Sequence, residues 1–317
     1  MIVITGAAGF IGSNLVRALN LEGVTNLILV DHFNDTTKAK NIKDVKYEKI
    51  IDREEFPQWL EANAHDVDFV FHLGARTDTA ELDYSVLEKL NPEYSKTLWT
   101  ICTEKNIPFL YASSAATYGI GEKGFNDDHS LIHDLKPLNP YGLSKQQFDV
   151  FVMEQSSAPP FWVGLKFFNV YGPREAHKGR MASVVLHAFR QIKESGEIEL
   201  FQSHHHDYND GEQLRDFIHV DDITNICLFF FKQRKLSGIY NCGTGEARTF
   251  NDLAKGIFNT MNLPVKIRYI PIPQDIRSRY QYFTEAEMSK LQSIGYHDPF
   301  ISLEEGIEKY VGFLRKG

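Results

Sequence analysis

The chain opens on MIVITGAAGFIGSN (residues 1–14), an apolar run that leads straight into three glycines spaced three residues apart. These are Gly6, Gly9 and Gly12, and apolar residues follow them at helical spacing. The stretch therefore predicts a strand, a glycine turn and a helix, in that order. A helix that begins at such a turn presents unpaired backbone N–H groups to an anion.

Outward from this turn, short apolar runs alternate with longer helical patterns through the first half of the chain. The runs occupy residues 1–5, 26–31, 45–50, 68–75, 108–114 and 161–172. Strands that are separated by helices need crossover connections, and such connections make the sheet parallel. The fold class that we predict is α/β, with a Rossmann-type doubly wound parallel sheet.

The pattern loosens from about residue 170, where we expect a smaller, interwoven α/β substrate domain. The runs 215–231 and 238–250 look like returns to the sheet region. We therefore expect two domains that exchange segments. The Rossmann domain would comprise residues 1–168 with about 214–241 and 281–297, and the second domain about 169–213, 242–280 and 298–317.

The composition argues against several classes of protein. The chain carries 34 Lys and Arg against 42 Asp and Glu, a net charge of −8, which argues against a nucleic-acid partner. Its three cysteines are widely spaced without a metal-ligand pattern, which indicates a reducing compartment. The sequence has no charged leader and no apolar run long enough to span a bilayer, so we expect a cytoplasmic protein without a membrane partner.

The spacing of the glycines is typical of a dinucleotide-binding turn. Gly6 would permit the turn, Gly9 would let the backbone approach a pyrophosphate, and Gly12 would let the helix pack on the strand. The second predicted strand ends at Asp31, where an acidic residue would hold a ribose hydroxyl and favour NAD. Positive charge nearby would instead suit the 2′-phosphate of NADP, and it is available from His32, Lys38, Lys40 and Arg53. The residues alone leave this choice open.

Tyr141 and Lys145 lie four residues apart in the stretch NPYGLSK, so on a helix they share a face. An ammonium group beside a phenol favours the phenolate, and we expect it to lower the pKa of Tyr141 from about 10. Tyr141 would then serve as a base for an alcohol proton. The stretch YASSAATYG ends a predicted strand, which makes Ser114 the candidate to hydrogen-bond the reacting oxygen, ahead of Ser113 and Thr117.

Four motifs, TGAAGFIG, SSAATYG, YGLSK and RDFIHVDD, resemble those of the extended short-chain dehydrogenase/reductase family. They lie between residues 5 and 222. Members of that family modify nucleotide-linked sugars with a nicotinamide cofactor. Its dehydratases carry an Asp-Glu pair where this chain has Ala115 and Ala116, so the resemblance disfavours dehydration.

A further stretch, FFNVYGPREAHKGRMASV, resembles the branch of the family that epimerises C6 of an ADP-linked heptose, and this likeness runs essentially end to end. It implies an isomerase that converts ADP-D-glycero-D-manno-heptose to the L-glycero epimer for the lipopolysaccharide inner core. It also implies one tightly bound NADP per subunit, a homopentamer and no metal. The resemblance assigns, for catalysis, Tyr141, Lys178, Ser114 and Lys145; for the cofactor, Gly6, Gly9, Phe10, Ile11, Gly12, Asp31, His32, Lys38, Arg53, Leu73, Gly74, Ala75, Asn91, Tyr141, Lys145, Val170 and Lys178; and for the sugar nucleotide, Ser114, Asn169, Arg180, His187, Phe201, Arg215 and Tyr280.

Two proton-transferring groups make chemical sense for such an epimerisation. Oxidation of the alcohol carbon gives a planar ketone when a nicotinamide takes the hydride and a base takes the hydroxyl proton. If the sugar then rotates before hydride returns, its oxygen lies elsewhere and needs a second acid, which Lys178 would supply. Two alternatives remain: a UDP-hexose 4-epimerase, which can reuse its tyrosine, and a non-catalytic dinucleotide-binding sensor.

Two further clusters of charge bear on ligands. Arg215 and Lys178 are candidates to offset the diphosphate of an ADP-sugar. The run His204, His205 and His206 is expected to form a polar loop and not a metal site, because three adjacent side chains cannot all face one ion.

Overall fold

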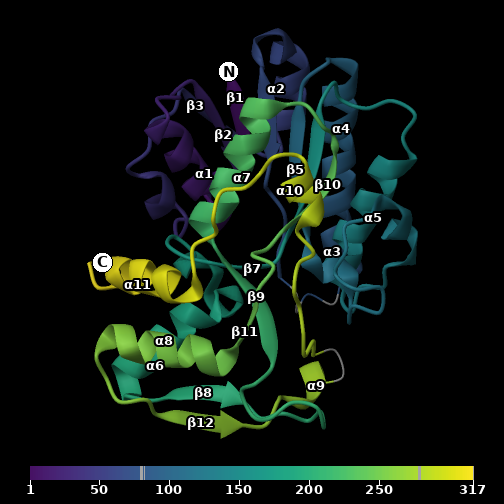
Figure 1. Ribbon diagram of the computed structural model, residues 1–317. Coiled ribbons are helices and arrows are strands. Elements are labelled where there is room, and N and C mark those ends of the chain that lie inside the picture. The colour runs from purple at the N-terminus through teal and green to yellow at the C-terminus, as the bar shows by residue number, and fades with distance from the viewer. Residues whose placement is uncertain (79–80, 82, 278–279, 317) are drawn as a thin grey trace.

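The computed structural model describes residues 1–78, 81, 83–277 and 280–316. Its centre is a seven-stranded sheet in which every neighbouring pair is parallel (Figure 1). In spatial order the strands are β10 (Gly238–Cys242), β6 (Trp162–Phe167), β5 (Phe109–Ser114), β4 (Phe69–His72), β1 (Ile2–Thr5), β2 (Leu27–Asp31) and β3 (Lys49–Asp52). The chain builds outward from β1 in one direction and then returns to β4 to build outward in the other. This confirms the predicted Rossmann-type doubly wound sheet.

Helices cover both faces of this sheet and enclose two separate cores. One face carries α1 (Phe10–Leu21), α7 (Val220–Gln233) and α10 (Ser289–Ser293), and the other carries α2 (Phe56–Asn63), α4 (Tyr94–Glu104) and α5 (Pro140–Glu154). Alternate residues of β1 divide between the cores, with Ile2 and Ile4 in the first and Val3 in the second. Burial on both faces explains why the central strands β1 and β4 are almost entirely apolar.

A smaller lobe occupies the lower part of Figure 1. It contains a three-stranded sheet in the order β11 (Ala247–Thr249), β9 (Leu214–His219) and β7 (Asn169–Tyr171), and a two-stranded sheet of β12 (Ile267–Ile270) and β8 (Ile198–Phe201). Helices α6 (Val184–Ser195), α8 (Phe250–Met261) and α11 (Leu303–Leu314) pack around a third core. The lobe therefore has apolar packing of its own.

Short helical segments connect the larger elements. They are α3 (Tyr84–Glu88), α9 (Gln274–Arg277), the 3₁₀ segments Ala39–Ile42, Ala64–Asp66, Ala115–Tyr118, His129–Asp134 and Ala176–Met181, and the π segment Lys89–Glu93. The three cysteines are buried free thiols. Across the described ranges, no helix combines the length and apolarity needed to cross a membrane.

Three predicted runs differ in detail from the observed strands. The run 161–172 is interrupted at Phe168, so that it supplies β6 to the large sheet and β7 to the three-stranded one. Strand β3 begins at Lys49, so the predicted run 45–50 contains only its first two residues. The run 215–231 places β9 in the three-stranded sheet, while helix α7 returns to pack against α1. Apolar patterning marks a strand without identifying the neighbour that it pairs with.

Candidate active site

A cavity of about 650 Å³ lies at the carboxyl ends of β1, β2 and β4, where helix α1 begins. Doubly wound sheets bind their ligands at this edge, where the strand order reverses. The predicted residues that line the cavity are Gly6, Gly9, Phe10, Ile11, Gly12, Asp31, His32, Lys38, Arg53, Leu73, Gly74, Ala75, Lys178 and Arg180. The structure thus brings most of the cofactor candidates together with two residues of the loop that follows β7.

The glycine turn at the cavity leaves no room for larger residues. Gly6 has a φ of +67°, and a Cβ on it would lie 2.7 Å from the Cα of Gly74. A Cβ on Gly12 would lie 2.1 Å from the carbonyl oxygen of Gly6. Helix α1 therefore starts directly behind the strand, with Gly9 as its N-cap residue. The N–H groups of its first turn lack partners inside the helix, an arrangement that fits the pyrophosphate of a dinucleotide.

Asp31 is buried at the end of β2, and its carboxylate is engaged from three sides. Oδ2 accepts from the N–H of Ala8 at 3.0 Å, while Oδ1 accepts from the N–H of His32 at 2.8 Å. The Nζ of Lys38 also donates to Oδ1, at 3.1 Å. Because Lys38 offsets its charge, Asp31 does not present an uncompensated carboxylate to the cavity.

Ser114, Tyr141 and Lys145 converge at the carboxyl end of β5. A side-chain hydrogen bond joins Tyr141, in the first turn of α5, to Ser114 at the end of the strand. Lys145 is buried one turn further along α5, where its Nζ donates to the carbonyl of Ala112 at 2.8 Å. A phenol, a hydroxyl and an ammonium group are therefore held by one helix and one strand.

The pKa of Tyr141 differs from the expectation drawn from the sequence. Burial raises this pKa above its ordinary value, and the hydrogen bond with Ser114 opposes the rise. The prediction of a Tyr141 pKa below its ordinary value was therefore wrong. The physical reason is that burial takes the phenol itself out of water and disfavours its phenolate, just as burial lowers the pKa of the Lys145 ammonium group to about 8. Spacing on a helix shows which side chains share a face, but not how far both are removed from water.

Lys178 lies in the 3₁₀ segment Ala176–Met181 and reaches the cavity beside the start of α1. Its Nζ is 5.5 Å from the centroid of the Phe10 ring. Burial lowers the pKa of Lys178, and the charge of Glu175 opposes that change. A lysine with a lowered pKa exchanges its proton more readily near neutral pH.

The loop that carries Lys178 is tied to the cofactor end of the cavity. The side-chain amide of Asn41 donates to the carbonyl of Arg174 at 3.0 Å and lies 3.2 Å from Nδ1 of His177. The guanidinium of Arg174 in turn donates to both carboxylate oxygens of Asp44, each at 2.9 Å. These contacts fix the approach of Lys178 to the cavity.

Three of the predicted sugar-nucleotide residues form a cluster in the smaller lobe. The guanidinium carbon of Arg215 lies 5.3 Å from the ring centroid of Tyr280, whose ring lies 5.9 Å from that of Phe201. Burial lowers the pKa of Arg215 from its high ordinary value. A buried guanidinium framed by aromatic rings is suited to an anionic or planar group.

The other predicted substrate residues lie in several elements. Asn169 is exposed on β7, His187 is half-buried on α6, and Arg180 forms an ion pair with Asp78 at 3.3 Å on the cavity. Val170, which was predicted to contact the cofactor, is half-buried on the same strand as Asn169.

Asn91, a predicted cofactor residue, lies behind the cavity wall. Its side-chain oxygen accepts from the N–H of Arg76 at 2.8 Å, and its nitrogen donates to Oγ of Ser144 on α5 at 2.9 Å. Asn91 therefore joins the cavity wall to the helix that carries Tyr141.

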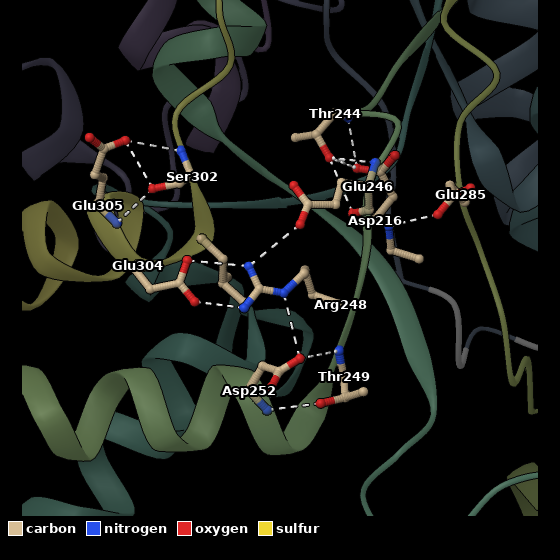
Figure 2. Close-up of polar contacts among 12 residues, drawn as sticks. Asp216, Thr244, Glu246, Arg248, Thr249, Asp252, Glu285, Ser302, Glu304 and Glu305 are labelled. Atoms are coloured by element: carbon tan, nitrogen blue, oxygen red, sulfur yellow. Dashed lines mark hydrogen bonds and ion pairs between the residues drawn. The ribbon is translucent and has the colours of Figure 1, made fainter.

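Asp216, the neighbour of Arg215 on β9, fixes the strand that presents this arginine (Figure 2). Its buried carboxylate accepts from the N–H and Oγ1 of Thr244 at 2.7 and 2.8 Å. It also accepts from the N–H groups of Gly245 and Ala286, both at 3.0 Å. Burial raises the pKa of Asp216 while these hydrogen bonds oppose the rise. The loops that contain Thr244 and Ala286 are thereby held against β9.

The run of histidines forms an exposed loop. The rings of His205 and His206 stack with centroids 4.7 Å apart, and one ligand atom from each lies within 4.8 Å of a carboxylate oxygen of Asp207. His204 turns elsewhere, since its Nε2 accepts from the N–H of Ile272 at 3.4 Å. The absence of a metal stays a prediction.

Several residues that line the cavity were missed by sequence reasoning. They are Asp35, Glu54, Arg76, Thr77, Asp78, Lys89, Tyr94, His177 and Met181, among others. Arg76, Thr77 and Asp78 could have been found, because they continue the predicted stretch 73–75 at the end of β4, and the ends of parallel strands face the ligand edge. His177 adjoins Lys178 in sequence. Tyr94 begins helix α4 and carries no local signal.

A profile of the NAD dependent epimerase/dehydratase family matches residues 2–243. The chain belongs to this family. Membership makes it an enzyme with a site for a nicotinamide dinucleotide, in agreement with the glycine turn and the cavity beside it. The matched residues include the whole of the large sheet.

Relatives in the epimerase/dehydratase family match this chain over its full length. It is 46% identical to the ADP-L-glycero-D-manno-heptose-6-epimerase of Fusobacterium nucleatum, over 98% of this chain and 97% of the relative. It is 41% identical to the protein of the same name from Brachyspira hyodysenteriae, over 100% and 98%. The crystal structure of the Helicobacter pylori ADP-L-glycero-D-manno-heptose-6-epimerase superposes with a TM-score of 0.84 at 31% identity, over 99% of this chain and 96% of that one. The UDP-glucose 4-epimerase of Thermotoga maritima gives 0.81 at 26%, over 99% and 98%.

Proposed function

We propose that this family member is an ADP-L-glycero-D-manno-heptose-6-epimerase. It would interconvert ADP-D-glycero-D-manno-heptose and its L-glycero epimer through transient oxidation at C6 of the heptose. The observation that carries the proposal is the meeting of Ser114, Tyr141 and Lys145 at the end of β5, together with Lys178 as a second proton-carrying group that lines the cavity; Ser114, Tyr141 and Lys145 themselves do not line it. Identity of 46% over nearly the full length of a relative with that name supports the choice of substrate.

We infer that the cofactor is NADP, held tightly with one molecule per subunit. A 2′-phosphate needs positive charge, and Lys38 and Arg53 line the cavity together with His32 and His177. Asp31 would repel a phosphate only weakly, because its carboxylate is paired with Lys38 and accepts two backbone N–H groups. Mass spectrometry of the small molecule released on denaturation tests this inference, since recovery of NAD would contradict it.

The chain's own groups would act on the hydroxyl at C6 of the sugar. The bound nicotinamide supplies a hydride acceptor and donor. Tyr141 takes or returns the hydroxyl proton, and the hydroxyl of Ser114 holds the reacting oxygen against it. Because burial raises the pKa of Tyr141, its phenolate needs positive charge nearby. Lys145, one turn along the same helix, supplies that charge.

Lys178 would serve the opposite orientation of the sugar. The ketone oxygen moves when the sugar turns its other face to the hydride donor, and Tyr141 is fixed on α5 and cannot follow it. Lys178 approaches from a different element, and its lowered pKa suits proton donation near neutral pH. Arg215 would offset diphosphate charge from the smaller lobe.

The reaction can be tested with the purified protein and no added NADP. Incubation with ADP-D-glycero-D-manno-heptose should give the L-glycero epimer, resolved by chromatography. Unchanged substrate in the presence of intact holoenzyme would overturn the proposal. Turnover of UDP-glucose alone would favour a UDP-hexose 4-epimerase, and bound cofactor without turnover of either sugar nucleotide would favour a sensor.

We propose further that the subunits form a homopentamer and that the domains follow the segment boundaries expected from the sequence. The first part rests on the family resemblance, and the second is supported by the separate core of α6, α8 and α11. Native mass spectrometry of the holoenzyme tests the pentamer.

A further inference from the structure

A fully buried ion pair lies directly behind the catalytic cluster. Asp149 on α5 and Lys166 on β6 are 0% and 1% exposed, and Nζ of Lys166 lies 2.7 Å from Oδ2 of Asp149. Oδ2 also accepts from Oγ of Ser113 at 2.6 Å, and Oδ1 accepts from the hydroxyl of Tyr111 at 3.0 Å. Lys166 donates a second hydrogen bond to Oγ1 of Thr117 at 2.6 Å. The two charges are thus completely enclosed in polar contacts.

Stability alone does not explain this pair. Removing two charges from water costs free energy, and replacing a buried ion pair by apolar residues is often neutral or stabilising. A pair kept at this cost calls for another role, and its position next to the catalytic residues supplies one.

Each member of the pair makes a hydrogen bond to a residue near Ser114 at the end of β5. Asp149 holds the hydroxyl of Ser113, the residue before Ser114. Lys166 holds Thr117, whose Oγ1 donates to the carbonyl of Ser114 at 2.9 Å. The backbone on both sides of the Ser114 side chain is therefore fixed by the pair.

Asp149 also acts on Lys145, which lies one helical turn before it on α5. Its negative charge raises the pKa of the Lys145 ammonium against the effect of burial. From β4, His72 faces the same lysine, but burial and Lys145 itself lower the pKa of His72 to about 3, so its ring is neutral. Tyr141 shares the helix, the carbonyl of Ala112 on β5 accepts from Nζ, and neither carries a charge at neutral pH.

We propose that Asp149 and Lys166 are a pair of positioning residues: together they fix the strand end that carries Ser114, Asp149 keeps Lys145 charged, and Lys166 limits how strongly Asp149 does so. The catalytic role of Lys145 rests on the proposed function. The electrostatic control of Lys145 does not, and it can be measured without turnover.

The test follows the titration of Lys145 in holoenzyme by NMR of lysine labelled with ¹³C at Cε. The Lys145 signal is assigned by its loss in Lys145→Arg. Asp149→Asn should lower the midpoint by about one pH unit or more, because the opposite charge is gone. Lys166→Met should raise the Lys145 midpoint, because the negative charge of Asp149 is then no longer offset by Lys166. Lys166→Arg keeps the charge and should restore the wild-type midpoint.

Shifts of opposite sign in Asp149→Asn and Lys166→Met support the proposal. A midpoint that stays at the wild-type value in both folded variants overturns it, and if one variant fails to fold, the other decides by the same criterion. Ser113→Ala, which removes a hydrogen bond but no charge, is the matched control and should leave the midpoint in place. With ADP-heptose, the alkaline limb of kcat should move with the Lys145 midpoint while KM changes little. Absence of turnover in the wild type would count against the proposed function only.

Discussion

Burial shifts the ionisable groups of the catalytic cluster toward their neutral forms. It raises the pKa of Tyr141, lowers that of Lys145 to about 8 and lowers that of Lys178. These shifts bring Lys145 and Lys178 closer to exchanging a proton near neutral pH, whereas Tyr141 depends on a neighbouring positive charge to lose its proton. We therefore expect kcat to change strongly when a single proton-carrying group of Tyr141, Lys145 or Lys178 is removed.

Tyr141→Phe removes the hydroxyl and keeps the ring. Because the proton of the sugar hydroxyl then has no acceptor, kcat should fall by about 10²–10⁴-fold with little change in cofactor content. Tyr240→Phe makes the same change on β10, where the hydroxyl donates to the carbonyl of Leu236, and should retain wild-type kcat. Full turnover by Tyr141→Phe would show that another group removes the proton.

Gly12→Ala tests the tight turn before α1. The new Cβ would lie 2.1 Å from the carbonyl oxygen of Gly6, so we expect a loss of about 2 kcal/mol or more in unfolding free energy and loss of bound cofactor. Gly312→Ala places the same methyl group on α11 with nothing within 4 Å and should be neutral or stabilising by up to about 1 kcal/mol. Urea unfolding of both variants measures this, and equal stabilities would contradict it.

At this scale, the glycine turn and the placement of Tyr141 and Lys145 one turn apart on one helix could be predicted, because each depends on spacing within a few residues. The pKa values of Tyr141 and Lys145 could not be predicted. They depend on burial against β4 and β5, which lie elsewhere in the sequence, and the pKa of Lys145 depends also on the charge of Asp149, which is paired with Lys166. The contacts of Asn91 with Arg76 and Ser144 could not be predicted either, because they join residues that are far apart in the sequence.

Polar contacts hold the C-terminal helix α11 to the elements around it (Figure 2). Arg248 on β11 donates to both carboxylate oxygens of Glu304, at 2.6 and 3.2 Å, while Ser302 and Glu305 form a capping box at the start of α11. Just before this cap, the N–H of Ile301 donates to Asp222 of α7 at 3.1 Å. These contacts join the smaller lobe to a helix of the large sheet.

Asp222→Asn should make stability less dependent on pH. Burial raises the pKa of Asp222 to about 7 from an ordinary value of 3.8, so between those values the folded protein binds more protons than the unfolded chain. Wild-type stability therefore falls as pH rises through this window. Asparagine keeps an acceptor for Ile301 without the charge, so the variant should be more stable than the wild type at about pH 8.5, with the advantage lost near about pH 4.

Urea midpoints at the two pH values measure this effect. Asp221→Asn alters the neighbouring exposed carboxylate, which pairs with Lys309 at 2.8 Å, and should change stability by less than about 1 kcal/mol at either pH. An Asp222→Asn variant that is destabilised equally at both pH values would show that its charge is tolerated.

Sheet membership was the main feature of the elements that the sequence could not show. The run from Phe161 to Gly172 is mostly apolar, yet the chain leaves the large sheet after Phe167, where β6 ends, and enters the three-stranded sheet at Asn169. The strand that it pairs with there, β9, lies more than forty residues away along the chain, with Phe217 opposite Asn169. Such a pairing leaves no mark on local hydrophobic patterning.

The whole molecule sets a cofactor-binding sheet above a smaller lobe (Figure 1), and the loop of Lys178, between β7 and α6 of that lobe, contacts Asn41 and Asp44 beside the large sheet. The parallel sheet could be predicted, because alternating strands and helices permit few other arrangements. The two small sheets and the third core could not, because their strands are short and pair across long separations. The expected substrate residues follow this division, with Arg215, Tyr280 and Phe201 in the smaller lobe.

Lys178→Met tests whether the reaction needs groups from both sides. Since the second orientation of the sugar then lacks a proton donor, kcat for epimerisation, measured per molecule of bound cofactor, should fall by about 10²-fold or more. Lys193→Met removes an exposed lysine from α6 and should have no effect. Retained epimerisation in Lys178→Met would indicate that Tyr141 serves both orientations, as in the 4-epimerase alternative.

The most direct measurement is epimerisation of ADP-D-glycero-D-manno-heptose in D₂O by holoenzyme with no added NADP. If Tyr141 and Lys178 move only hydroxyl protons and the hydrogen on C6 leaves and returns as hydride, the L-glycero product contains no deuterium at C6 by NMR. Deuterium at C6 would mean that this hydrogen exchanges with water as a proton, and would contradict the account.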